Sequence, residues 1–337
     1  MEEIVTQIVA HSVKHYVSDL HLCARQPARW RRQGELEELP GGAPEPESLL
    51  QMWLSPVQRA QFDSCGQLDF AVALKDGRRL RASAFRQCDG VSLALRLLPE
   101  DTPQLAQLDV PPSIPALLES DGGLLLVTGA TGSGKSTTLA AMVDHINNHH
   151  ARHILTLEDP IEFIHRSRRS LVQQREIGEH CPDFSAGLRA ALREDPDVIL
   201  LGELRDEQSI RLALTAAETG HLVLATLHTR GAYQAIERLL DGFSAAEQGR
   251  VRSQLAGSLR AVLAQKLVAA RDGGRVALFE LMINIPAVAS LIREGKLHQL
   301  PTVLHTGKQY GMQTFNQSMA QRREQGVIAD VSPDVGR

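Results

Sequence analysis

A run of glycine and hydroxyl residues that ends in a lysine could hold the phosphates of a nucleotide. The run is Gly129-Ala130-Thr131-Gly132-Ser133-Gly134-Lys135-Ser136, followed by Thr137, and it fits the spacing G-x-x-x-x-G-K-[ST]. Glycines let backbone N–H groups turn inward around phosphate oxygens, and the N-terminus of a following helix adds a positive dipole. Lys135 is expected to reach the β- and γ-phosphates, and the Ser136 hydroxyl to bind Mg²⁺.

Two acidic positions, each just past an expected strand, could drive hydrolysis of the bound nucleotide. Glu203 follows the apolar run Val198–Leu201 and Gly202, beside the expected metal and attacking water, and would hold the metal through a water molecule. Glu162 closes the acidic cluster that begins at Glu158, and could accept the proton of that water. Ligands of α/β proteins bind at the carboxyl edge of the sheet, where we expect both carboxylates. The alternative is that they are ordinary acids of surface loops.

Two histidines bracket the apolar run Leu222–Leu227. His228, at its carboxyl end, is a candidate sensor of the γ-phosphate, and His221, at its amino end, is a second candidate. A hydrogen-bonded structural role remains the alternative for each. His149, His150 and His153 superficially suggest a metal site, but the polar end of a helix is the preferred interpretation.

These motifs lie in a region where apolar runs of strand length alternate with helical patterns, which indicates a parallel sheet covered by helices. The expected strands are Leu124–Thr128, His153–Leu157, Val198–Leu201 and Leu222–Leu227. Helical spacing predicts helices over 137–146, over 210–217 and, on the apolar positions from Val251 to Leu267, over a longer segment.

The first hundred residues predict a small α+β domain with a mostly antiparallel sheet. The expected elements are a helix over 4–13, strands over 18–22 and 91–97, and a hairpin whose strands 68–74 and 80–84 flank the turn 75–77. Five prolines from Pro99 to Pro115 favour extended chain, so we expect a linker there. The expected organisation is therefore an N-terminal domain (1–98), a linker (99–115), an α/β domain with C-terminal helices (116–319) and a polar tail (320–337).

Composition narrows the expected partners and compartment. A chain of 337 residues suits two cores, while a net charge of -4 and 4% aromatic residues argue against direct nucleic-acid binding. The basic clusters Arg29/Arg31/Arg32 and Arg166/Arg168/Arg169 are interpreted as solvated loop charges. Four scattered cysteines without a CxxC pair fit a reducing cytoplasm. Without an apolar run of membrane-spanning length, membrane association is expected to require a partner.

Four segments together resemble the Walker A, Asp box, Walker B and His box of secretion ATPases. They are GATGSGKST (129–137), LEDPIEF (157–163), VILLGELRD (198–206) and GHLVLATLHT (220–229). The resemblance extends to residues 18–22, 79–85, 190–197 and 311–314, and so covers nearly the whole chain. The compact N-terminal domain and the lack of a tetracysteine module resemble the pilus retraction ATPases of the PilT type.

The resemblance implies an α/β fold with a RecA-like P-loop ATPase domain and a smaller PAS-like N-terminal α+β domain. It implies ATP and Mg²⁺ as ligands, Glu162 and Glu203 as the Asp-box and Walker B glutamates, and His228 as a residue near the nucleotide. It also implies a homo-hexameric motor that retracts pili, located in the cytoplasm and held at the inner membrane by a platform protein. Arginines could then act on the site of a neighbouring subunit; the candidates are Arg81 and Arg96 on strands, Arg189 and Arg193 four apart on one helix face, and Arg205.

One segment departs from the retraction pattern. The family helix typically reads AIRNLIRE, whereas Ala287–Glu294 reads AVASLIRE and lacks the first arginine. The alternatives are therefore a motor for pilus assembly, type II secretion or conjugative export, and a non-hydrolysing regulator that only binds nucleotide.

Overall fold

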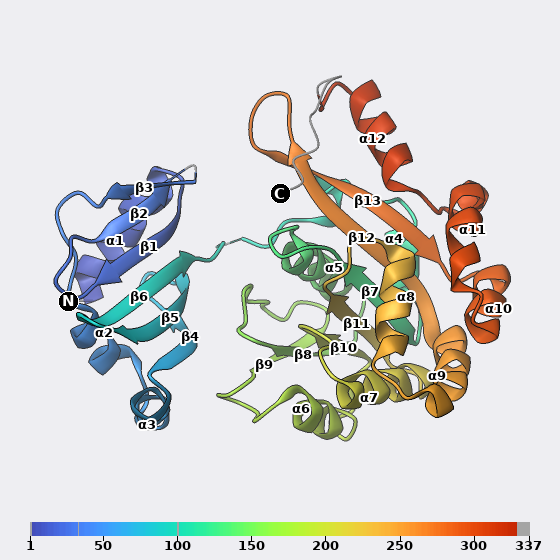
Figure 1. Ribbon diagram of the computed structural model, residues 1–337, viewed down its shortest axis with the longest axis horizontal. Coiled ribbons are helices and arrows are strands. Elements are labelled where there is room, and N and C mark those ends of the chain that lie inside the picture. Colours follow the sequence, from blue (N-terminus) through green and yellow to red (C-terminus); the bar gives the residue numbers. More distant parts are fainter. Residues whose placement is uncertain (1, 33, 100, 329–337) are drawn as a thin grey trace. The chain divides into compact units, whose positions relative to one another are not determined.

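The computed structural model describes residues 2–32, 34–99 and 101–328 (Figure 1). The chain forms two compact units. The first holds the residues up to Asp101 together with Pro160–Phe163, and the second holds Thr102–Asp159 and the residues from Ile164 onward. Each unit has its own sheet and its own hydrophobic core.

The first unit is a six-stranded antiparallel sheet with strand order β3-β2-β1-β6-β5-β4. Its elements are α1 (Glu2–Lys14), β1 (Val17–Cys23), β2 (Arg29–Arg32), β3 (Glu35–Glu38), α2 (Pro46–Trp53), α3 (Pro56–Cys65), β4 (Gln67–Ala73), β5 (Arg79–Gln87) and β6 (Gly90–Leu97). The predicted N-terminal helix, the strands and the β4–β5 hairpin are confirmed.

Side chains of this sheet alternate between a core face and a polar face. Leu80, Ala82 and Ala84 of β5 are fully buried, in one core with Leu49 and Phe62 of the helices. Arg79 and Arg81 of β5 and Arg96 of β6 lie on the other face of the sheet.

The second unit is a seven-stranded sheet with strand order β13-β12-β7-β11-β10-β8-β9. All neighbouring strands pair in parallel except β12 and β13, which are antiparallel. Its strands are β7 (Gly123–Thr128), β8 (His153–Glu158), β9 (Leu171–Glu176), β10 (Val198–Leu201), β11 (Leu222–Leu227), β12 (Leu259–Ala269) and β13 (Arg275–Ile283). The four predicted parallel strands are confirmed.

Helices cover both faces of this sheet (Figure 1). They are α4 (Ile114–Leu118), α5 (Lys135–His149), α6 (Phe184–Ala191), α7 (Glu207–Glu218), α8 (Ala232–Asp241), α9 (Ala245–Ser258), α10 (Pro286–Glu294), α11 (Leu300–Thr306) and α12 (Phe315–Glu324), with the 3₁₀ turns η1 (Leu105–Gln107), η2 (Leu297–Gln299) and η3 (Gly307–Tyr310). In β7, Leu124 and Leu126 share a core with helices α6–α11, while Leu125 and Val127 share a core with α4 and α5. Because both faces of β7 are buried, its sequence is a continuous apolar run.

The long helix predicted over 251–267 is wrong in its second half. Helix α9 ends at Ser258, and β12 begins at Leu259. Strand β12 lies between β7 and β13, so consecutive residues such as Val262 and Leu263 are buried on opposite faces. A strand buried on both faces gives an unbroken apolar run, which periodicity alone does not separate from a buried helix.

The segment for which a linker is predicted contains core residues. Leu105 and Ile114 are buried with Leu118 in the second unit. At the other end, α12 extends into the segment predicted as a polar tail, and residues 329–337 of that tail lie outside the described residues.

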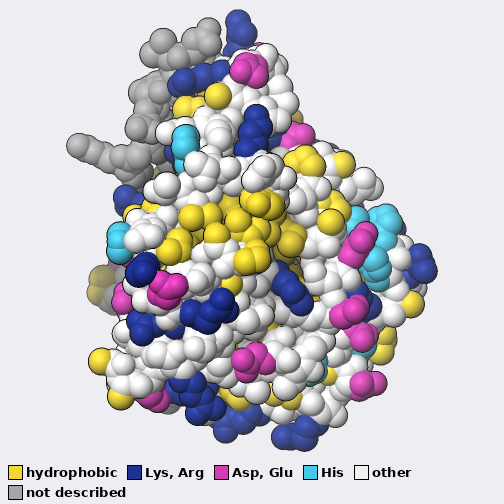
Figure 2. All heavy atoms as spheres, turned by 90° about the vertical axis from the view of Figure 1, so that its right-hand side faces the viewer, with side chains coloured by type: hydrophobic (Ala, Val, Ile, Leu, Met, Phe, Trp, Pro, Cys, Tyr) yellow, Lys and Arg dark blue, Asp and Glu magenta, His cyan; other side chains and the backbone are white. Residues whose placement is uncertain are grey.

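Two features bear on which partners the chain could contact: an apolar surface patch and the length and polarity of its helices. Figure 2 shows hydrophobic side chains gathered in the middle of one face of the molecule, with lysine and arginine side chains nearby. Across residues 2–32, 34–99 and 101–328, each helix is too short or too polar to cross a lipid bilayer.

A half-buried histidine makes the stability of the second unit dependent on pH. Burial lowers the pKa of His165 from 6.5 to about 4, against a smaller opposing effect of Asp144. The unfolded chain therefore binds a proton that the folded chain excludes, and stability falls as the pH drops from 6.5 towards 4. We expect the loss from this residue between pH 7 and pH 5 to be about 2 kcal/mol.

Urea unfolding at the two pH values checks this expectation. His165→Gln should show a smaller loss of stability between pH 7 and pH 5 than the wild-type chain. The exposed His298 provides the matched control, since His298→Gln should keep the wild-type pH dependence. Equal losses in His165→Gln and the wild-type chain would contradict the expectation.

Candidate nucleotide-binding site

The phosphate loop joins β7, which is buried on both faces, to helix α5. The chain reverses at Gly132 and Gly134, whose φ angles are 76° and 89°. A side chain at Gly134 would meet Gln265, because a Cβ atom there would stand 2.8 Å from the Gln265 Nε2. The loop needs glycine at this position both for its backbone conformation and for space.

Lys135 points back into the loop. Its side chain is buried, and Nζ donates hydrogen bonds to the carbonyl oxygens of Gly129 at 2.8 Å and Ala130 at 3.1 Å. Ser136 and Thr131 are exposed, and the buried Ser133 hydroxyl has no hydrogen-bond partner among the described residues. A buried ammonium group in a glycine-rich loop at the start of a helix, next to the exposed Ser136 hydroxyl in the sequence, fits the phosphates of a nucleotide and their Mg²⁺ ion.

Glu203 lies at the same edge of the sheet. The backbone on either side of it continues the sheet, since Gly202 N donates to the Leu157 carbonyl at 2.8 Å and Leu204 N to the Thr226 carbonyl at 3.1 Å. This extension places Glu203 just past the carboxyl end of β10, while the phosphate loop follows the carboxyl end of the parallel strand β7. The structure thus brings Glu203 to the sheet edge where the sequence predicts it.

Two basic groups hold the Glu203 carboxylate. Arg205 Nε donates to Oε2 at 2.7 Å, and His228 Nε2 lies 3.1 Å from Oε1. Arg205 also approaches Asp159 at 3.6 Å. The hydrogen bond to Glu203 is the largest effect that raises the pKa of Arg205. Glu203, His228, Arg205 and the end of β8 therefore form one polar network.

A pair of threonines joins the phosphate loop to the segment of His228. Thr128 Oγ1 accepts a hydrogen bond from Thr229 N at 3.0 Å and lies 2.7 Å from Thr229 Oγ1. Thr128 is fully buried, so these contacts are shielded from water. The sequence analysis does not predict this link, although Thr128 ends one predicted strand and Thr229 lies two residues past the end of another.

His221 is not brought to this edge. It lies at the amino end of β11, and its Nδ1 is 3.0 Å from the Ala216 carbonyl oxygen near the end of α7. The six residues of β11 separate it from His228 by about 20 Å. The structure therefore shows a hydrogen-bonded position for His221 at the opposite edge of the sheet.

The arginines of α6 also differ from expectation. Helix α6 ends at Ala191, so Arg193 lies beyond it and does not share a helix face with Arg189. After the helix ends, Asp195 adopts a left-handed backbone conformation with a φ of 55°, and Pro196 follows it. Both arginines are exposed.

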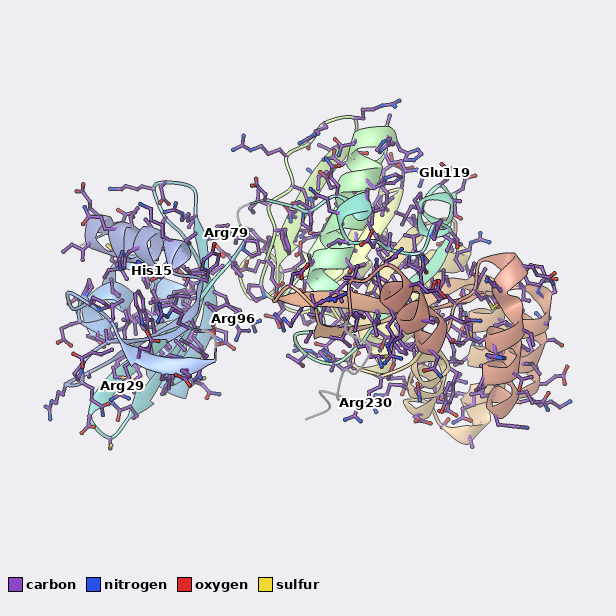
Figure 3. All side chains as sticks on the ribbon, turned by 90° about the horizontal axis from the view of Figure 1, so that it is seen from above. His15, Arg29, Arg79, Arg96, Glu119 and Arg230 are labelled. Atoms are coloured by element: carbon purple, nitrogen blue, oxygen red, sulfur yellow. The ribbon has the colours of Figure 1, made fainter. Side chains whose placement is uncertain are left out.

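The remaining predicted residues belong to the first unit. Arg81 and Arg96 lie opposite each other on β5 and β6, and Arg96 Nε donates to Asp19 at 2.9 Å; Arg96 and Arg79 are labelled in Figure 3. Glu162 lies in Pro160–Phe163, a segment that packs with this unit, where Arg79 Nη1 donates to the Ile161 carbonyl at 2.6 Å.

A phosphate loop, a strand-end glutamate and a helix-covered parallel sheet define a P-loop nucleotide-binding protein of the α/β class. Residues 1–328 match the family model "Type II/IV secretion system protein", and the chain belongs to that family. The resemblance to secretion ATPases is thereby confirmed.

Similar proteins cover nearly the whole chain. YggR of Escherichia coli (strain K12) is 66% identical over 322 residues, which span 96% of this chain and 99% of YggR. The type IV pilus retraction ATPase PilT of Pseudomonas aeruginosa is 43% identical over 328 residues, covering 96% of this chain and 95% of PilT. A crystal structure of the pilus retraction motor PilT with bound ADP matches with a TM-score of 0.88 and 40% identity, over 97% of this chain and 94% of that one. The likeness to PilT confirms the predicted fold class, a P-loop ATPase domain with a smaller N-terminal domain.

Proposed function

We propose that this protein is an ATP-hydrolysing motor that powers retraction of type IV pili. Two observations together support the proposal. The phosphate loop and Glu203 lie at the same edge of the sheet, and the chain is similar to PilT over nearly its whole length. The ADP bound to the related PilT structure supports a nucleotide as the ligand of the loop. The same full-length match favours retraction over pilus assembly, type II secretion and conjugative export.

In this proposal, the loop residues Gly129–Thr137 bind the phosphates of ATP, and the hydroxyl of Ser136 binds Mg²⁺. A Mg²⁺ ion held by Ser136 would supply positive charge that stabilises the phosphoryl group during transfer. Glu203 orients the water shell of the metal, Glu162 accepts a proton from the attacking water, and His228 senses the γ-phosphate through its contact with Glu203.

The proposed assembly is a ring of six chains, in which an arginine from one chain completes the site of the next. Arg81 and Arg96 are the first candidates because they lie side by side on the polar face of the first unit's sheet, and Arg189, Arg193 and Arg205 are the others. Such an arginine is worth about 10³ to 10⁵ in rate. Hydrolysis would move the two domains, 1–98 and 116–319, about the segment between them.

The output of the motor is proposed to be force on a platform protein at the inner membrane, applied from the cytoplasm. The apolar group of side chains in Figure 2 supports a protein contact on that face, since such patches mark interaction sites. The net charge of -4 supports a protein partner over nucleic acid.

Steady-state ATP hydrolysis over a range of protein concentrations that spans ring assembly tests the proposal. We expect the rate per chain to rise in step with the hexamer fraction measured by light scattering, because one chain lacks the arginine of its neighbour. Nucleotide binding without turnover at any concentration would instead identify a regulator. Loss of pilus retraction on deletion of the gene, with pilus assembly intact, would distinguish retraction from the other motor roles.

A further inference from the structure

Gln265 lies on the strand next to the phosphate loop. Strand β12 pairs in parallel with β7 up to Ala264, which is opposite Thr128. Strand β7 ends there and the chain turns into the loop, whereas β12 continues to Ala269. The register therefore places Gln265 beside Gly129, the first residue of the loop.

Gln265 approaches the loop at three places. Its backbone carbonyl oxygen lies against Gly129, so closely that any Cβ atom there would collide with it. Its side-chain Nε2 would stand 2.8 Å from a Cβ atom at Gly134, the last residue before α5. Its Oε1 accepts a hydrogen bond of 2.7 Å from Thr138 Oγ1 in the first turn of α5.

The burial of this amide is unusual for its strand. Gln265 is 4% exposed, while its predecessors Leu263 and Ala264 are fully buried apolar residues. An amide removed from water destabilises the fold unless hydrogen bonds replace those to water. Packing in the strand does not require an amide at this position, because an apolar side chain would also fit. We therefore attribute the presence of the polar side chain to its contacts with the phosphate loop.

We propose that Gln265 is a positioning residue for the nucleotide: it fixes the beginning of the phosphate loop relative to the start of α5, with its amide against the phosphate-binding backbone. This inference rests on the proposed function. The N–H groups of the loop must lie within hydrogen-bond distance of the phosphate oxygens, and a shift of about 1 Å in such a site can lower the rate by about 10²-fold.

Two substitutions separate this role from simple packing. Gln265→Glu keeps the size and the acceptor for Thr138, but places a negative charge beside the loop that holds negative phosphates. We expect its Kd for Mg²⁺-ADP to rise at least about 10-fold, and because the position is buried the defect should persist at high salt. Gln265→Leu removes the hydrogen bond, and its kcat/KM for ATP should fall about 10-fold or more, mainly through KM.

The controls use the same protein in its assembled form. Gln321→Glu on the exposed surface of α12 makes the same charge change away from the loop and should bind Mg²⁺-ADP as the wild-type chain does. Thr138→Val removes the hydroxyl partner of Gln265, so adding it to Gln265→Leu should have little further effect. The unfolding temperature of each variant shows whether the folded state is retained.

The results of these experiments either support the role of Gln265 or overturn it. Weaker Mg²⁺-ADP binding by folded Gln265→Glu, with wild-type binding by Gln321→Glu, would support the inference. Wild-type binding by Gln265→Glu would overturn it while leaving the proposed function intact, and so would a Gln265→Leu chain whose only defect is a lower unfolding temperature. Failure of the wild-type chain itself to bind Mg²⁺-ADP would overturn the proposed function and this inference together.

Discussion

Lys135→Ala is expected to lower kcat/KM for ATP by about 10³-fold, the largest single effect in this chain. The Lys135 ammonium is the buried positive charge at the centre of the phosphate loop, and it bonds to the carbonyl oxygens of Gly129 and Ala130. In the proposed complex it moves from these carbonyls to the β- and γ-phosphates, where hydrogen bonds between charged groups are strongest. Its removal should weaken nucleotide binding as well as turnover.

Two measurements check this expectation. Steady-state hydrolysis gives kcat/KM, and thermal unfolding with and without Mg²⁺-ADP reports binding, because a ligand at 100 times its Kd stabilises the native state by about 2.7 kcal/mol. The stabilisation should be absent in Lys135→Ala. Lys308→Ala, at an exposed position of η3, is the matched control and should behave as the wild-type chain. Undiminished hydrolysis in Lys135→Ala would mean that the measured activity belongs to a contaminating ATPase.

Local patterns predict where the phosphate loop, Glu203 and His228 lie in the fold. The phosphate loop can be recognised because its function depends on consecutive residues, Gly129 to Ser136, between a strand and a helix. Glu203 and His228 follow runs buried on both faces, and parallel strands bring their carboxyl ends to one edge. Their 3.1 Å contact is a consequence of that topology.

Contacts between residues far apart in the sequence are the part that patterns do not predict. Gln265 lies 127 residues from Thr138, and no local spacing indicates that β12 is the neighbour of β7. For the same reason, the sequence does not show that Leu259–Ala269 lies between two strands, and its apolar run resembles part of a helix. Arg189 and Arg193 have helical spacing, but the chain leaves the helix at Ala191 before the second of them.

Glu203→Gln is expected to lower kcat by about 10²-fold to 10³-fold while nucleotide binding is retained. The substitution keeps the shape of the side chain and one oxygen, but removes the charge that attracts Arg205 and His228 and would order the metal-bound water. The phosphate loop is untouched, because Lys135 bonds to loop carbonyls and not to Glu203. The defect should therefore appear in kcat, with little change in the Kd for Mg²⁺-ADP, the reverse of the pattern for Gln265→Leu.

Steady-state kinetics and Mg²⁺-ADP titration of the same preparation test this division of roles. Glu207→Gln on the exposed first turn of α7 removes one negative charge four residues away and should leave kcat unchanged. If Glu203→Gln hydrolyses ATP at the wild-type rate, the carboxylate serves only its contacts with Arg205 and His228, and the catalytic role passes to Glu162. If it loses binding instead, the network of Arg205, Glu203 and His228 shapes the nucleotide pocket and does not act on the attacking water.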